Sequence, residues 1–178
     1  MTSATPAPAR AVAAASYPVP ENEPARLRAV ETYVRARAFV RADLIRGTAF
    51  LLKVPVAMIA LVEEDRVRVL SRHGGDVRSV PRGVAFSSHT ILSDRVMVIP
   101  DTHADPRFSN NPLTRREPPV RFYAGAPLIT RDGYAIAALC VMDWSPRGFS
   151  EESATALAGM ALRVMNELDL CLTGRATR

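Results

Sequence analysis

Residues 121–143 constrain the fold more than any other part of the sequence, because they predict a β-hairpin. Two apolar runs, RFYAGAPLIT (121–130) and AIAALCVMD (135–143), flank the turn residues RDGY. Asp132 and Gly133 suit a tight hairpin turn, which needs positive φ angles. Both arms are rich in glycine and alanine, so we expect a helix or a ligand to approach them closely. A chain built around this hairpin must form an antiparallel sheet.

Three further segments have the pattern of strands. VAMIALV (56–62) is a continuous apolar run, typical of a strand buried on both faces. VRVLS (67–71) alternates apolar and polar residues, and EEDR between the two predicts a second hairpin. RVMVIPD (95–101) is a third, short strand. The stretch 74–121 around it is a long loop region, and loops of this length in a compact domain commonly bind something.

Two helices are predicted before the strands, over residues 21–34 and 40–53. In the second of them Asp43 is a candidate N-cap. Gly47 in its middle costs about 1 kcal/mol relative to alanine, so we expect close packing there. The expected buried stripe of this helix consists of Val40, Leu44, Thr48 and Leu51.

A terminal helix is predicted over residues 150–172, with Ser150 as its N-cap. Its apolar residues recur at close to a 3.5-residue period, which is typical of a helix that pairs with a partner helix. We therefore expect this seam to join two copies of the chain. The seam consists of Leu157, Ala161, Val164, Leu168 and Cys171.

Length and composition predict one soluble globular domain. The chain has 178 residues, of which 48% are hydrophobic and 23% charged. We divide it into a disordered Ala/Pro-rich tail (1–20), one domain (21–172) and a flexible C-terminal tail (173–178). It lacks a run of the roughly 18 apolar residues that cross a membrane and a secretory signal. Two cysteines are too few for a disulfide framework, so we expect a cytoplasmic protein.

The net charge of +5 does not by itself predict a nucleic-acid partner. Lys53 is the only lysine, and the arginines are interspersed with acidic residues instead of forming one block. His73 and His103 lie in loops without metal-ligand spacing. We expect no metal, no membrane and no nucleic acid, and the sequence identifies no cofactor.

The segment AFSSHTIL (85–92) holds the candidates for chemistry. A Ser87–His89 nucleophile pair is disfavoured, because residues two apart on a helix face different directions and no activating motif surrounds them. We interpret Ser87 and Ser88 as helix N-cap or first-turn residues, whose hydroxyls satisfy free backbone amides. His89 is either a hydrogen-bonded residue of a pocket wall or a contact to a ligand.

Other pocket candidates lie further along the chain. Arg107 either clamps an anionic group beneath Phe108 or bridges to Asp101 or Asp105. The period of two in a strand puts Arg121 and Tyr123 on one face, and we favour Tyr123 pointing into a cavity. The full set of predicted ligand-binding residues is Phe86, Ser87, His89, Asp101, Arg107, Phe108, Arg121, Tyr123 and Asp143.

From Glu21 to Leu172 the chain resembles a GAF domain, the PAS-like sensory module of bacterial histidine kinases and diguanylate cyclases. The resemblance rests on ENE, AFSSHTIL, VIPDTHADPRFSNNPL and RFYAGAPL…DGYAIAALCVMD in this order. It implies an α+β fold with an antiparallel sheet of about six strands. Terminal helices lie on one face and commonly dimerise, and a loop-built pocket lies on the other.

The resemblance implies a stand-alone sensory protein of signal transduction. It would bind a small ligand, or a partner such as a histidine kinase, a diguanylate cyclase or another effector, and catalyse nothing. In the related subgroup a cysteine commonly occupies the position of Ser87. The family's free methionine-(R)-sulfoxide reductases need loop cysteines, and residues 74–121 contain none. A purely structural dimerisation module is the remaining alternative.

Overall fold

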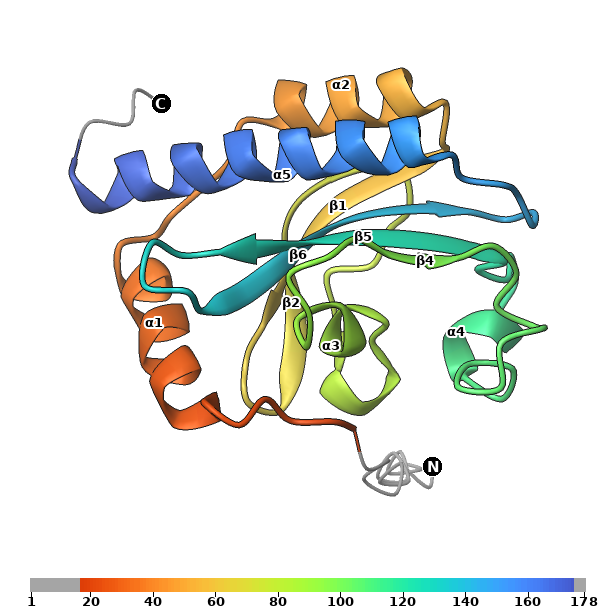
Figure 1. The fold of residues 1–178 in the computed structure, drawn as a ribbon, viewed down its shortest axis with the longest axis horizontal. Helices are drawn as coiled ribbons and strands as arrows, with labels where there is room; N and C mark the ends of the chain where they lie inside the picture. The colour runs from red at the N-terminus through yellow and green to blue at the C-terminus, as the bar shows by residue number, and fades with distance from the viewer. Residues whose placement is uncertain (1–16, 175–178) are drawn as a thin grey trace, which may run out of the picture.

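The computed structural model describes residues 17–174, which form a six-stranded antiparallel sheet flanked by helices (Figure 1). The strand order is β3-β2-β1-β6-β5-β4. This confirms the predicted α+β architecture. The elements are α1 (Glu23–Arg35), α2 (Ala42–Leu52), β1 (Val56–Val62), β2 (Arg66–His73), β3 (Ser79–Pro81), η1 (Arg82–Val84), α3 (Ser87–Thr90), β4 (Met97–Ile99), α4 (Pro112–Arg115), β5 (Phe122–Ile129), β6 (Ala135–Asp143) and α5 (Glu151–Leu172).

Both predicted hairpins are present, and their inner strands pair at the centre of the sheet. β1 pairs with β2 on one side and with β6 on the other, and every residue of β1 is buried. β6 also pairs with β5, and Gly133 in their turn has a φ of 84°. The strand expected over 95–101 is shorter than predicted, because β4 pairs with β5 only over Met97–Ile99.

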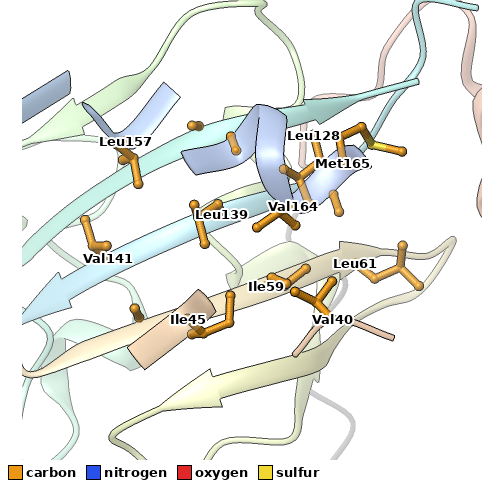
Figure 2. Close-up of a cluster of buried hydrophobic side chains, with 14 of the residues drawn as sticks. Val40, Ile45, Ile59, Leu61, Leu128, Leu139, Val141, Leu157, Val164 and Met165 are labelled. Carbon is orange, nitrogen blue, oxygen red and sulfur yellow. The ribbon is translucent and has the colours of Figure 1, made fainter. Parts of the chain in front are cut away.

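Helices α2 and α5 cover one face of the sheet, which we call the helix face (Figure 1). Alternate residues of each strand point into this layer, as Ile59 on β1 and Leu139 on β6 do (Figure 2). From α5, Leu157 and Val164 complete the same core and are fully buried. The seam predicted to join two chains therefore packs against the chain's own sheet. A buried stripe has the same period whether it faces a sheet or a partner helix.

Helix α2 differs from its prediction in three respects. Its N-cap is Arg41, without a side-chain cap, and Asp43 lies in the first turn with its carboxylate 2.6 Å from Arg46. A Cβ atom added to Gly47 would meet nothing within 4 Å, so nothing packs closely there. Leu51 of the predicted stripe is 55% exposed, and the buried face contains Ile45 instead.

The opposite face of the sheet, which we call the cavity face, is covered by the long region 74–121 (Figure 1). This region is not a plain loop, because it contains β3, η1, α3, β4 and α4. Most of the predicted N-terminal tail lies outside the described residues. Its last four residues lack regular secondary structure, and the Tyr17 hydroxyl donates a hydrogen bond to the carbonyl oxygen of Glu64. Between residues 17 and 174 no helix is long and apolar enough to cross a membrane.

Candidate functional site

A narrow apolar cavity of about 60 Å³ lies between the cavity face of the sheet and the covering region 74–121. Its floor is built from alternate residues of the central strands, because successive side chains of a strand point to opposite faces. β1 contributes Met58 and Ala60, and β6 contributes Cys140 and Met142. The same alternation sends Ile59 into the helix-face core.

The wall and roof of the cavity are largely apolar. Phe86 lies at the start of α3, and its ring is 5.0 Å from that of Phe108 and 5.1 Å from that of Tyr123. These edge-on and tilted contacts are favourable arrangements for aromatic rings. Leu113 of α4 and Val120 close the other side. The region 74–121 therefore reaches the sheet through packed side chains.

The Tyr123 hydroxyl forms hydrogen bonds with two other polar side chains at the cavity. The Tyr123 hydroxyl lies 2.7 Å from Thr90 Oγ1 and 3.2 Å from Cys140 Sγ. Burial raises the pKa of Tyr123 well above its ordinary value, and it raises the pKa of Cys140 to about 12 although the Tyr123 hydrogen bond opposes it. Both groups are therefore protonated near neutral pH. A protonated thiol is a poor nucleophile, so Cys140 is not poised for thiolate chemistry.

Arg116 and Trp144 lie at the edge of the cavity. Both line it, and the Arg116 guanidinium is 3.6 Å from the exposed carboxylate of Asp76. Surface pairs of this kind contribute little stability. Asp76 lies in the 74–78 loop, so this weak pair joins two loops at the rim.

The predicted pocket residues fall into two groups. Phe86, Ser87 and Tyr123 line the cavity, and Phe108 packs behind Phe86. His89 does not line it, since its ring packs against Phe108 at 4.9 Å. Burial, reinforced by the positive charge of Arg107 and opposed by Asp105, lowers the pKa of His89. The half-buried His89 ring therefore packs behind Phe108 and outside the cavity lining, and its role in ligand binding stays a prediction.

The charged candidates form ion pairs away from the cavity. Arg107 bridges to Asp105 at 2.6 Å, which is one of the two alternatives we considered. The remaining two pairs lie at the ends of β4, β5 and β6. They are Asp101–Arg121 at 2.9 Å and Asp143–Arg147 at 3.0 Å.

The serines of α3 lie in its first turn, which is one of the two positions we considered, but their side chains do not cap the helix. The N-cap position is occupied by Phe86 in helical conformation, without a side-chain hydrogen bond. The Ser88 hydroxyl instead donates a hydrogen bond to the carbonyl oxygen of Arg82 at 2.7 Å. Because Arg82 lies in η1, this hydrogen bond links α3 to the preceding 3-10 helix.

Sequence reasoning missed several lining residues, above all Trp144 and the two methionines of the floor, Met58 and Met142. Their alternation along β1 and β6 could have suggested a shared face. An all-apolar strand does not show which of its two faces borders a cavity. Among residues 17–174, no group of three or more His, Cys, Asp or Glu side chains is placed to hold a metal ion. What the site can do chemically is to enclose a small, largely apolar molecule.

A family model described as GAF domain matches residues 42–168. A cyclic di-GMP phosphodiesterase of Pseudomonas aeruginosa is 34% identical over 155 residues, which is 85% of this chain and 26% of the relative. The chain thus spans about a quarter of that protein's length. The expectation that the chain catalyses nothing is contradicted by this similarity, because the relative is named as an enzyme.

Solved structures that share the fold include a domain of a phosphotransferase and a reductase. The GAF domain of an Acinetobacter phosphoenolpyruvate-protein phosphotransferase has a TM-score of 0.60 at 16% identity, covering 84% of this chain and 97% of that one. A free methionine-R-sulfoxide reductase of Neisseria meningitidis has a TM-score of 0.61 at 15% identity, covering 85% of this chain and 88% of that one. Similarity at this level of identity establishes the fold alone.

Proposed function

Because the chain belongs to the GAF domain family, we propose that it is a sensory module that regulates cyclic di-GMP hydrolysis. The cavity carries this proposal, since it is a partly enclosed apolar space beneath the covering region of a sensory fold. The link to cyclic di-GMP comes from the phosphodiesterase that matches 85% of the chain. In this proposal the cavity receives the signal and the phosphodiesterase is the output.

The sensed ligand is small and apolar, and it is not cyclic di-GMP itself. A volume of about 60 Å³ is far below the roughly 300–1,000 Å³ of pockets that hold drug-sized ligands. Arg116 is the only charged side chain that lines the cavity within residues 17–174. A cyclic dinucleotide carries two phosphates, and burying them would need more cationic partners.

The signal would leave the domain through the helix face. Leu139 of β6 is a neighbour in sequence of the floor residue Cys140, and it packs into the core beneath α5 (Figure 2). A ligand that shifts the floor would therefore shift α5. We place the contact with a second copy, or with the effector, on the outer side of α2 and α5. There Phe50 is 85% exposed and Leu162 is 69% exposed.

Trp144 allows a direct test, because it is the only tryptophan of the chain and lines the cavity. We expect titration with small apolar compounds such as toluene to change its fluorescence saturably. Ala60→Leu fills the floor and should abolish this change. The matched control Ala36→Leu at the end of α1, outside the cavity lining, should respond like the unchanged protein.

The regulatory role needs a second measurement. The matching segment of the Pseudomonas phosphodiesterase is replaced by this chain, and cyclic di-GMP hydrolysis is followed with and without a compound that changes Trp144 fluorescence. We expect the rate to change with the ligand, and the response to disappear with Ala60→Leu. If a compound is shown to bind and the rate of cyclic di-GMP hydrolysis does not change, the proposal is refuted.

A further inference from the structure

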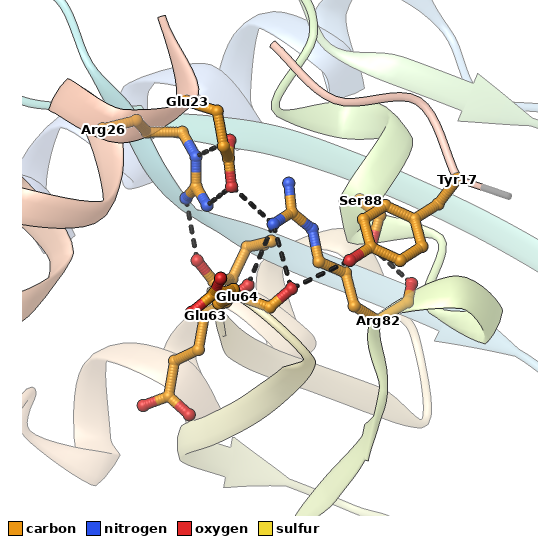
Figure 3. A network of polar contacts seen from close by, with 8 residues as sticks. Tyr17, Glu23, Arg26, Glu63, Glu64, Arg82 and Ser88 are labelled. Atoms are coloured by element: carbon orange, nitrogen blue, oxygen red, sulfur yellow. Dashed lines mark hydrogen bonds and ion pairs between the residues drawn. The ribbon is translucent and has the colours of Figure 1, made fainter. Parts of the chain in front are cut away.

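Two arginines are fully buried at the junction between α1 and the β1–β2 turn. Arg26 and Arg82 are each 1% exposed, and they share the carboxylate of Glu23 (Figure 3). Arg26 binds both carboxylate oxygens at 2.7 Å and also donates to the carbonyl oxygen of Val62 at 2.8 Å. All three nitrogens of its guanidinium are therefore bonded.

Arg82 uses only one of its three nitrogens. Its Nη1 lies 2.5 Å from Glu23 Oε1 and also donates to the carbonyl oxygens of Glu63 and Glu64 at 3.2 and 3.3 Å. Its Nε and Nη2 are buried and have no hydrogen-bond partner among the described residues. These two nitrogens form the edge of the guanidinium that matches two oxygens of a carboxylate or phosphate.

The cluster also carries an excess of positive charge. Two buried guanidinium groups face one carboxylate, and the Glu63 side chain points away from them and pairs with Arg68 at 2.7 Å (Figure 3). A buried charge is normally paired and hydrogen-bonded, because removing it from water is costly. The Arg82 edge thus lacks one anionic partner.

Tyr17 covers this edge. The Arg82 guanidinium carbon lies 4.7 Å from the centre of the Tyr17 ring, within the range of a cation–π contact. The Tyr17 hydroxyl donates to the same Glu64 carbonyl that Arg82 contacts (Figure 3). Residues 17–20 lack regular secondary structure, so no helix or sheet hydrogen bonds hold the Tyr17 ring over Arg82.

We propose that Arg82 is a binding site for a small oxyanion and that Tyr17 is its lid. The bound group presents two coplanar oxygens to Nε and Nη2, as a free phosphate or a small carboxylate does. The anion supplies the missing negative charge, and the Tyr17 ring must move aside to admit it. This site is separate from the apolar cavity and does not depend on the function proposed for it.

The site is connected to the cavity wall through the main chain. The Arg82 carbonyl accepts the hydrogen bond of Ser88 in α3, and the neighbouring Ser87 lines the cavity. The Arg82 amide donates to the carbonyl of Asp65 in the β1–β2 turn. An anion that reorients Arg82 therefore acts on both the turn and the wall.

The experiment follows the Nε–H resonance of Arg82 by NMR on the full chain, assigned through Arg82→Lys. Sodium phosphate and sodium acetate are titrated separately, with sodium chloride at the same ionic strength as the reference. We expect a saturable shift with phosphate or acetate that chloride does not produce, and whichever anion binds more tightly identifies the oxyanion class. Tyr17→Ala should tighten binding about tenfold by removing the lid, and Tyr17→Phe should have an intermediate effect.

Arg82→Lys keeps the charge but lacks the two-nitrogen edge, so it should lose the saturable anion binding that isothermal titration calorimetry measures in the unchanged protein, while circular dichroism shows an intact fold. Arg147→Lys is the matched control, since Arg147 is partly buried and paired with Asp143, and it should leave anion binding unchanged. If chloride, phosphate and acetate shift the Arg82 Nε–H resonance equally in folded Tyr17→Ala, the proposed anion site is wrong. If the unchanged protein and Tyr17→Ala bind the anion with equal affinity, Tyr17 does not act as a lid.

Discussion

Gly125 occupies a position that has no room for a Cβ atom. It lies on β5, and a Cβ atom at this position would come within 2.8 Å of Thr90 Oγ1 and would also collide with the Tyr123 hydroxyl. The close approach expected from the glycine content of the hairpin is therefore made by these two hydroxyls. They are 2.7 Å apart, and they link α3 to the sheet at the edge of the cavity.

Gly125→Ala should destabilise the domain by about 1–3 kcal/mol, because the added methyl group overpacks a filled site. Gly47→Ala is the matched control, since Gly47 lies in α2 with open space around it. It should stabilise the domain by up to about 1 kcal/mol through helix propensity. Urea denaturation of both variants checks this pair, and equal stability of the two would contradict it.

Helix α5 is the element whose two sides have different roles. Leu157 and Val164 are fully buried against the sheet, whereas Leu162 is 69% exposed on the outer side. Helix α2 lies beside α5 (Figure 1) and exposes Phe50. Substitutions in the predicted seam would therefore probe folding, and only the outer side can report on association.

Leu162→Glu should keep the fold and convert an associated species to monomer in analytical ultracentrifugation, because it places a charge in the proposed contact. Leu157→Glu should instead unfold the domain, since an unpaired carboxylate would enter the core. Circular dichroism separates the two effects. A monomer already present in the unchanged protein would exclude association through this surface.

At the scale of the whole molecule, the Glu23 cluster ties the N-terminal helix to the sheet. Burial disfavours the charged carboxylate, but the hydrogen bonds and charges of Arg26 and Arg82 outweigh it and lower the pKa of Glu23 from 4.5 to about 2. The charged form is thus favoured in the folded state. Its contribution to stability is complete above about pH 4.5 and is lost as the pH falls towards 2.

Glu23→Gln should lower the free energy of unfolding by about 3–5 kcal/mol at neutral pH, because it leaves two buried guanidinium groups without their carboxylate. In this variant the free energy of unfolding should also no longer fall between about pH 4.5 and 2 by the amount that protonation of Glu23 causes. Urea denaturation across this pH range checks both effects. Glu31→Gln on the same helix, in an exposed pair with Arg35, should change stability by less than about 1 kcal/mol.

Much of the fold was predictable because it depends on local pattern. The turn at Asp132 and Gly133, the apolar run of β1 and the Ser150 cap of α5 are all where the sequence put them. Alternation along β5 put Tyr123 and Phe122 on opposite faces, and the small residues beside Tyr123 favoured the cavity direction that it has in the structure. Each of these features is set by neighbours within a few residues.

Features that depend on distant residues were not predictable. The α5 stripe looks the same whether it meets the sheet or a second chain, and Arg82 resembles a surface residue until Glu23 is placed beside it. Trp144 and Arg116 reach the cavity from separate segments. By itself the sequence determined the strands, the helices and the family, because hydrophobic period and turn chemistry are local. Only the tertiary structure decided the cavity and the buried charges, because they arise from contacts between segments far apart in the chain.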